Sequence, residues 1–122
     1  MPTYMGGCHC GRVRFEVSGQ IGRVLDCNCS ICRKKGFLHW IVEPGQFRLL
    51  SSPDALSLYE FHTKTAKHYF CSACGISSYY IPRSHPNMID VNLRCVDGVN
   101  LEELKIEFFD GQDWEQARAD LD

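Results

Sequence analysis

The 122-residue sequence lacks an excess of basic residues, a long apolar run and the features of a secretory signal. Thirteen Lys and Arg residues stand against fifteen Asp and Glu, for a net charge of −2, so the charge balance does not favour a polyphosphate partner such as nucleic acid. No apolar run approaches the ~18 residues of a membrane-spanning helix. The segment Met1–Tyr4 has neither the basic nor the apolar region of a signal peptide. We therefore expect a cytoplasmic protein with no nucleic-acid or membrane partner.

The sequence also lacks internal repeats, low-complexity stretches and linkers, which favours one domain over residues 1–122. Three segments alternate apolar and polar residues with period two, as strands with one buried and one solvated face do. Their apolar positions are Val13, Phe15 and Val17; Ile89, Val91 and Leu93; and Leu104, Ile106 and Phe108. Further β-type runs cover residues 37–42, 47–50, 56–61 and 76–81. The pattern predicts a mostly β fold.

One helix is expected, close to the C-terminus. Asp113 can cap its first turn, and Gln116 three residues later completes a capping-box pattern. Trp114, Ala117 and Leu121 then share one face. We expect a short helix that docks on the sheet, with Trp114 as a packing anchor.

Cysteine, by contrast, is abundant, with eight residues in 122. Seven of them cluster, and Cys95 stands alone. We call Cys8, Cys10, Cys71 and Cys74 the quartet, and Cys27, Cys29 and Cys32 the triplet. Because the cytosol keeps thiols reduced, clustered cysteines favour metal binding over disulfides. Redox chemistry is the alternative, but no helix-opening Cys-x-x-Cys follows a βαβ pattern here.

Zinc prefers four ligands in a tetrahedron. A Cys-x-x-Cys turn followed by Gly75, which can take a positive φ, is typical of a zinc knuckle. If the quartet holds one zinc, the triplet can hold a second with one position open for water or substrate, as catalytic zinc sites do. A rival partition joins Cys27 and Cys32 to Cys71 and Cys74, and leaves Cys8, Cys10, Cys29 and Cys95 for another ion. The spacing allows both partitions.

Three motifs carry a family resemblance. They are GCHCG at residues 7–11, CNCSICRKKG at 27–36 and FCSACG at 70–75. In this order they resemble the glutathione-dependent formaldehyde-activating enzyme (GFA) family, over about residues 6–111. Residues 68–84 and 110–115 are most similar to its centromere protein V branch.

The resemblance implies a zinc-bearing β-tent with a short C-terminal helix, and a single GFA-type zinc-binding domain over residues 1–122. It implies two zinc ions per chain, a structural one held by the quartet and a catalytic one held by the triplet. It also implies that the chain joins glutathione and formaldehyde into S-(hydroxymethyl)glutathione. That activity is classed as a carbon–sulfur lyase for the reverse direction. The alternative is a non-catalytic, zinc-stabilised binding module of the centromere protein V type.

The chemistry is physically reasonable for three cysteine ligands and an open position. Zinc lowers the pKa of a bound thiol, so glutathione can bind as a thiolate and add to formaldehyde held beside it. The alkoxide that forms then needs zinc or a proton donor. Residues 33–35 (Arg-Lys-Lys) either face the two carboxylates of glutathione or form a solvated run that offsets the thiolate charge.

Other polar side chains are expected to have structural roles. His39 lies in an apolar run, as a packed core histidine would. His62 and His68 flank a polar turn, so we expect them to be exposed. Cys95 is expected to be a buried free thiol.

Overall fold

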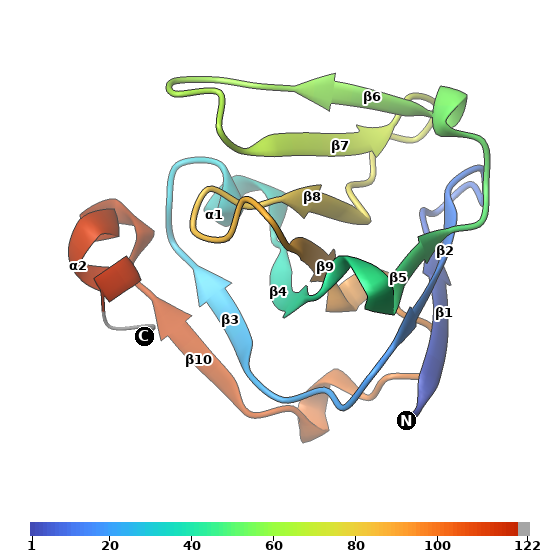
Figure 1. Cartoon of the computed structure of the whole chain (residues 1–122), viewed down its shortest axis with the longest axis horizontal. Coiled ribbons are helices and arrows are strands. Elements are labelled where there is room, and N and C mark those ends of the chain that lie inside the picture. The colour runs from blue at the N-terminus through green and yellow to red at the C-terminus, as the bar shows by residue number, and fades with distance from the viewer. Residues whose placement is uncertain (120–122) are drawn as a thin grey trace.

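The computed structural model describes residues 1–119, except for the side chain of Ala117. Ten strands in this part of the chain form two sheets (Figure 1). The smaller sheet is antiparallel and consists, in spatial order, of β1 (Thr3–Gly7), β2 (Arg14–Ser18) and β5 (Phe47–Leu49).

The larger sheet has seven strands. In spatial order they are β10 (Ile106–Phe109), β3 (Val24–Cys27), β4 (Leu38–Val42), β9 (Ile89–Asn92), β8 (Tyr79–Ile81), β7 (Lys67–Cys71) and β6 (Leu56–Tyr59). All neighbours are antiparallel except β10 and β3, which run parallel. Parallel strands end at the same edge of a sheet, so the segments that follow β3 and β10 leave it side by side. The N–H of Asn28 joins them by donating to the carbonyl of Phe109 at 3.2 Å.

Short helices connect the strands. The two α-helices of the described chain are α1 (Cys32–Lys35) and α2 (Trp114–Ala119). The 3₁₀ turns are Pro44–Gln46, Pro53–Ala55, Leu93–Cys95, Leu101–Glu103 and Gly111–Asp113. None of the helices within residues 1–119 is long and apolar enough to cross a membrane.

The main hydrophobic core lies between the two sheets. Successive strand residues point to opposite faces, so Trp40 and Val42 of β4 enter this core together with Val91, the neighbour of Trp40 on β9. Phe15 and Val17 enter it from β2 and are fully buried. Each such side chain stabilises the fold by about 1.5–3 kcal/mol on burial. This packing fixes which residues of β4 and β9 face away from the core.

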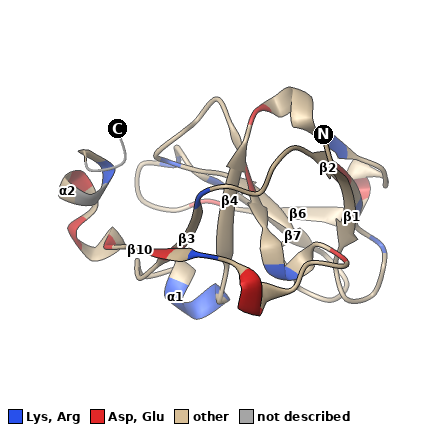
Figure 2. Ribbon diagram, turned by 90° about the horizontal axis from the view of Figure 1, so that it is seen from below, with Lys and Arg blue, Asp and Glu red and all other residues tan. Residues whose placement is uncertain are grey.

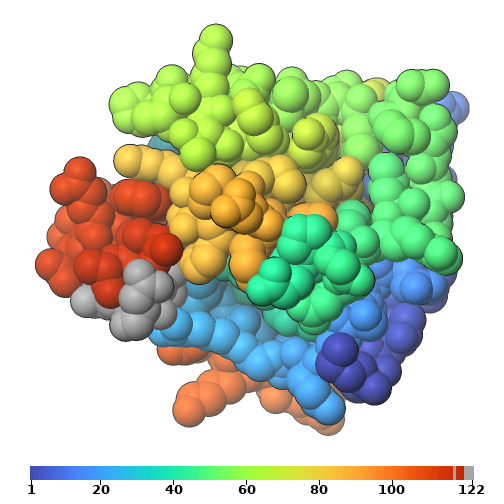
Figure 3. All heavy atoms as spheres, in the orientation of Figure 1, coloured from blue at the N-terminus to red at the C-terminus, as the bar shows by residue number. Residues whose placement is uncertain are grey.

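The opposite face of the larger sheet carries the remaining residues of these strands. His39 and Ile41 of β4 point to this face, and so does Asp90 of β9, which is paired with Ile41. Figure 1 shows α2 beside the end of β10, and Figure 3 shows the C-terminal segment against the connection between β8 and β9. The Arg118 side chain makes that contact by donating from Nε to the carbonyl of Ser84 at 3.0 Å. Part of this face is therefore covered by the C-terminal segment and the connection between β8 and β9.

The prediction of a mostly β fold with a short C-terminal helix is confirmed. The helix begins at Trp114, after Asp113, as expected. Leu121 and the side chain of Ala117 lie outside the described residues, so their shared face stays a prediction. Three strands, β1, β3 and β7, are missed by the sequence pattern because their residues do not alternate clearly between apolar and polar.

The alternation of residues 89–93 predicts that Asp90 and Asn92, which lie between the apolar positions, form a solvated face, and this prediction is wrong. Both are buried, at 1% and 7% exposure. The period of two is correct, but β9 is a central strand whose second face is covered by the rest of the chain. The amide of Asn92 is satisfied there, since it accepts from the N–H of Leu38 at 3.3 Å and donates to the carbonyl of Ser77 at 3.0 Å.

The expected buried face of the last strand is also wrong. Ile106 and Phe108 are exposed, at 43% and 69%, whereas Phe109 is buried. β10 is an edge strand that is paired only with β3, and Phe109 lies opposite Cys27 in that pairing. Phe109 packs with Leu25, Cys27 and Cys32, so the triplet, not the main core, determines which face of β10 is buried.

Candidate metal centres and an adjoining cavity

The quartet joins the turn between β1 and β2 to the turn that follows β7. Its four sulfur atoms lie within 4.8 Å of one another. The sulfur of Cys10 is 3.6 Å from those of Cys8 and Cys71. Zinc with Zn–S bonds of about 2.3 Å places its sulfur ligands about 3.8 Å apart, so the quartet fits a tetrahedral ion. Gly75 has φ of 80°, which confirms the positive φ expected after the Cys-x-x-Cys turn.

Backbone N–H groups around the quartet favour its thiolate forms. The N–H of Val13 donates to the sulfur of Cys8 at 3.3 Å. The N–H groups of Ile76 and then of Cys10 lower the pKa of Cys74 to about 6. Thiolate is the form of cysteine that binds metal, so the backbone here prepares a metal site.

The triplet lies between the end of β3 and the start of α1. Its three sulfur atoms also lie within 4.8 Å of one another. The N–H of Cys29 donates to the sulfur of Cys27 at 3.5 Å, and the N–H of Cys32 donates to the sulfur of Cys29 at 3.4 Å. The thiols of Cys27 and Cys32 lower the pKa of Cys29 by donating to its sulfur, while the contact with Cys29 raises the pKa of Cys27 to about 11. Such a set of thiols can hold a cation through three of four tetrahedral positions.

The segment after β10 holds the triplet loop in place. Asn28 donates from its amide to the carboxylate of Asp110 at 2.9 Å, and its amide oxygen accepts from the N–H of Gln112 at 3.1 Å. Gly111 lies so close that a Cβ there would come within 2.6 Å of the sulfur of Cys27 and 2.7 Å of the Cβ of Cys29. A larger residue at position 111 would displace the triplet.

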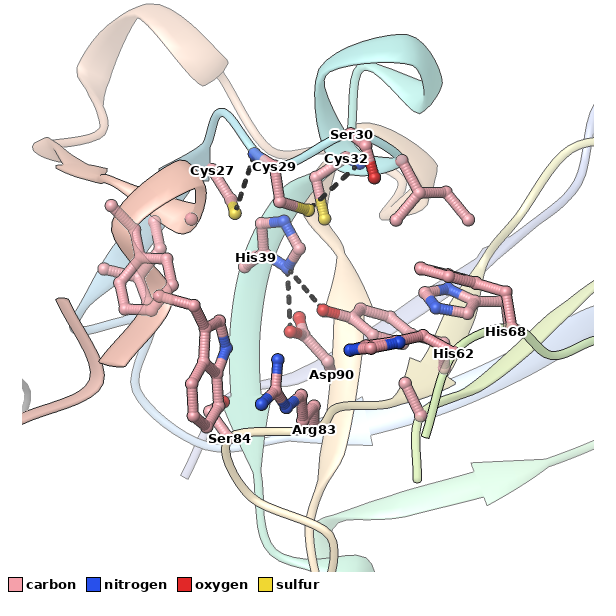
Figure 4. Close-up of a pocket in the computed structure, with 18 of the residues that line it drawn as sticks. Cys27, Cys29, Ser30, Cys32, His39, His62, His68, Arg83, Ser84 and Asp90 are labelled. Atoms are coloured by element: carbon pink, nitrogen blue, oxygen red, sulfur yellow. Dashed lines mark hydrogen bonds and ion pairs between the residues drawn. The ribbon is translucent and has the colours of Figure 1, made fainter. Parts of the chain in front are cut away.

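A cavity of about 430 Å³ adjoins the triplet, and all three triplet cysteines line it (Figure 4). Its walls are mostly apolar and aromatic and include Leu25, Ile31, Ile41, Phe61, Tyr80, Phe109 and Trp114. Arg83 is the only Lys or Arg that lines this cavity in residues 1–119. The guanidinium of Arg83 lies over the ring of Trp114, 3.8 Å from its centroid. An apolar cavity with one fixed cation suits a small organic anion.

The basic residues of α1 do not line this cavity. Figure 2 shows them along α1, and Arg33 and Lys34 are exposed, as in a solvated run. Lys35 instead points to His68, with 3.2 Å between Nζ and Nδ1, and lies over the rings of Phe37 and Tyr80. The sequence did not indicate Arg83 or Gly111, because neither belongs to a cysteine motif.

The expectation of an exposed His68 is wrong, since only 4% of it is accessible. Its ring stacks on Tyr80 with 4.8 Å between centroids. Burial and then the charge of Lys35 lower the pKa of His68 to about 4. His68 is therefore a neutral acceptor for Lys35. His62 is exposed, as expected, at the rim of the cavity.

His39 is buried, as expected, at 3% exposure, but it also lines the cavity. Its Nδ1 lies 2.8 Å from Oδ2 of Asp90 and 3.4 Å from the hydroxyl of Tyr80. In Figure 4 the ring of His39 lies between the triplet and Asp90.

Comparison with known proteins agrees with this geometry. The sequence profile of the family described as glutathione-dependent formaldehyde-activating enzyme matches residues 3–112. The chain belongs to this family. Among GFA-related proteins, one from Halomonas elongata whose name places it in the same family is 26% identical over 101 residues. The match covers 75% of the chain and 64% of the relative, so the chain spans less than two thirds of that protein's length.

A crystal structure of a protein from Rhodobacter sphaeroides is similar to this GFA chain as well. It shares 36% sequence identity with a TM-score of 0.79, and the match covers 85% of the chain and 98% of that structure. The resemblance to the centromere protein V branch stays a prediction.

In this GFA chain the cysteines group as quartet and triplet, each within one local cluster. The set of the rival partition, Cys27 and Cys32 with Cys71 and Cys74, is not brought together in the described chain. Cys95 belongs to neither cluster and is half-buried rather than buried as expected. Its thiol is 3.8 Å from the carbonyl of Ser77, and partial burial raises its pKa. Two cysteine clusters in this chain could therefore bind metal ions.

Proposed function

We propose that this chain catalyses the reversible addition of glutathione to formaldehyde at the triplet, as a carbon–sulfur lyase in the direction that releases formaldehyde. The observation that carries the proposal is the position of the triplet at an apolar cavity of about 430 Å³. A three-cysteine cluster leaves one tetrahedral position for a further ligand, and the cavity provides space for a small thiol and aldehyde. Membership of the GFA family supports this choice of substrates.

In this proposal residues 1–122 form one zinc-binding domain with two zinc ions. Cys8, Cys10, Cys71 and Cys74 bind the structural ion, and Cys27, Cys29 and Cys32 bind the catalytic one. Zinc held by the triplet would supply Lewis acidity and would lower the pKa of a substrate thiol bound there.

The residues of the chain itself orient the substrates. Phe109 and Trp114 exclude water from one side of the cavity, which strengthens polar interactions inside it. Arg83 binds a carboxylate of glutathione, because its guanidinium is held on the Trp114 ring and makes no ion pair within residues 1–119. This assigns to Arg83 the role that the sequence suggested for residues 33–35.

Exchange spectroscopy on glutathione and carbon-13-labelled formaldehyde tests the proposal. The uncatalysed rate must be measured in parallel, because formaldehyde adds to thiols without help. We expect zinc-loaded protein to accelerate exchange, and Cys29→Ser to abolish the acceleration. Cys95→Ser is the matched control, since it removes a thiol outside both clusters and should leave the rate unchanged.

If the zinc-loaded wild type matches the uncatalysed rate with glutathione and with other small thiols, the lyase proposal is wrong. The chain would then be a zinc-stabilised binding module.

A further inference from the structure

His39 has one nitrogen with a partner and one without. Nδ1 faces Oδ2 of Asp90 at 2.8 Å, and both side chains are almost fully buried. Nε2 is buried and has no hydrogen-bond partner in the described chain. A buried polar atom without a hydrogen-bond partner is destabilising, so a group from outside these residues is needed to satisfy Nε2.

Asp90 determines which nitrogen of His39 carries the proton. An ionised carboxylate only accepts hydrogen bonds, so Nδ1 must donate to it. In the neutral ring Nε2 then has a free lone pair and acts as an acceptor. A carboxylate that orients a histidine in this way also stabilises the imidazolium once the second nitrogen gains a proton.

The free nitrogen is turned toward the triplet. Because Nδ1 faces Asp90 and the ring lies between Asp90 and the triplet in Figure 4, Nε2 is on the triplet side. His39 and the three cysteines line the same cavity. However, His39 is not part of the cluster whose ligand atoms lie within 4.8 Å of one another. His39 is therefore not grouped with the triplet as a fourth ligand, and the cavity that it shares with the three cysteines provides the space for a substrate.

We propose that His39 carries the proton between the sulfur and the oxygen of the substrates, and that Asp90 positions it. This inference rests on the proposed function. In the direction of addition, Nε2 takes the proton from the glutathione thiol. The sulfur electron pair then forms the S–C bond to formaldehyde, the π pair of C=O moves to oxygen, and Nε2–H gives its proton to that oxygen. In the reverse direction Nε2 takes the hydroxyl proton, C=O forms again as the S–C electron pair leaves on sulfur, and Nε2–H returns its proton to that sulfur.

The substitution His39→Gln tests this role in the zinc-loaded protein. General acid–base catalysis contributes ~10²–10⁴-fold, so we expect kcat for glutathione–formaldehyde exchange to fall by about 10²-fold or more, with KM nearly unchanged. His9→Gln is the matched control, because His9 is exposed and does not line this cavity. Thermal melting and zinc content establish that His39→Gln is folded and loaded.

The absorption spectrum of cobalt(II)-substituted protein separates a proton carrier from a metal ligand. We expect the same ligand-field bands in the wild type and His39→Gln. If the bands of His39→Gln instead shift as expected for the loss of a nitrogen ligand, His39 is a metal ligand and the proposal is overturned.

Nitrogen-15 NMR of the His39 ring gives a second test that does not depend on a variant. We expect Nδ1 protonated and Nε2 unprotonated in the wild type, and an Nε2 resonance that moves when glutathione and formaldehyde are added. In Asp90→Asn the amide can donate to Nδ1, so we expect the proton to move to Nε2 and the exchange rate to fall with it.

The outcomes distinguish the two proposals. A wild type that accelerates exchange and a folded His39→Gln that is equally fast would overturn the role of His39 and leave the lyase function standing. NMR that finds the proton of the neutral wild-type ring on Nε2 would likewise overturn the role of His39 without affecting the lyase function. A wild type that does not accelerate exchange would overturn both.

Discussion

Gly111 shows how a single residue can control a candidate metal centre. It belongs to the turn after β10, far from the triplet in the sequence, yet its backbone approaches the triplet loop so closely that a Cβ would clash there. The contact distances of 2.6 Å and 2.7 Å that a Cβ would make with Cys27 and Cys29 are far below van der Waals separation. The need for glycine here comes from this close approach.

We expect Gly111→Ala to remove the metal of the triplet and to leave that of the quartet. The methyl group must push Cys27 or Cys29 away, which breaks the arrangement of the three sulfur atoms. The measured zinc content should therefore fall from two ions per chain to one, and exchange activity should fall with it. Gly22→Ala is the matched control, because a Cβ at Gly22 meets nothing within 4 Å. Unchanged zinc content in Gly111→Ala would contradict this prediction.

The lowered pKa of His68 predicts that the stability of the protein depends on pH. Its pKa is lowered from 6.5 to about 4, so on acidification the unfolded chain binds this proton first. The free energy of unfolding should then fall between about pH 6.5 and 4, by at most about 3 kcal/mol from this residue. Lys35→Met should raise the pKa of His68 and reduce the fall, because it removes a neighbouring positive charge.

NMR titration of the His68 ring measures its pKa. Urea unfolding at several pH values measures the free energy of unfolding. Comparing the variant with the wild type at each pH cancels the contribution of metal loss, which also occurs in acid. A wild-type His68 that titrates near 6.5 would contradict the prediction.

At the scale of elements, the two cysteine clusters differ in what they join. The quartet connects the β1–β2 turn of the smaller sheet with the turn after β7 of the larger sheet. The triplet comes from one loop, and Asn28 already holds this loop to residues 110–112 without a metal. A metal at the quartet therefore constrains the fold far more than one at the triplet.

We expect Cys71→Ser to unfold or aggregate the protein, because Cys71 is fully buried and its cluster links the sheets. Binding at structural zinc sites contributes on the order of 10 kcal/mol in finger peptides, which is comparable to the ~5–15 kcal/mol net stability of a domain. Cys29→Ser should keep the wild-type circular dichroism and a melting temperature within a few degrees. A soluble Cys71→Ser variant with unchanged melting and zinc content would refute the structural role.

For the molecule as a whole, we expect two classes of zinc. Purified protein should hold up to two ions per chain, and a chelator should remove one much faster, since a three-cysteine site has fewer bonds to break and adjoins a cavity. Elemental analysis after timed exposure to chelator measures both. Loss of both ions at one rate would contradict the two classes, and absence of zinc with disulfides detected by mass spectrometry would contradict metal binding altogether.

Several strands and the C-terminal helix could be predicted from the local pattern of residue types. The strand at residues 14–18 and the helix after Asp113 follow from alternation and capping, which are properties of a few neighbouring residues. The faces of β9 and β10 could not be predicted in the same way. Whether Asp90 or Phe108 meets solvent depends on which segments cover each face of the sheet, and those segments are distant in the sequence.

The mostly β class, the two groups of clustered cysteines and the family could be predicted from the amino-acid sequence, because they depend on residue types at fixed separations along the chain. Three contacts became visible only in the folded chain: Asp90 lies beside His39, Gly111 lies against the triplet, and Arg83 rather than residues 33–35 lines the cavity. The physical reason is that each of these contacts joins residues on different strands or loops. The distance between such residues is set by sheet order and core packing, which cannot be predicted from a few neighbouring residues.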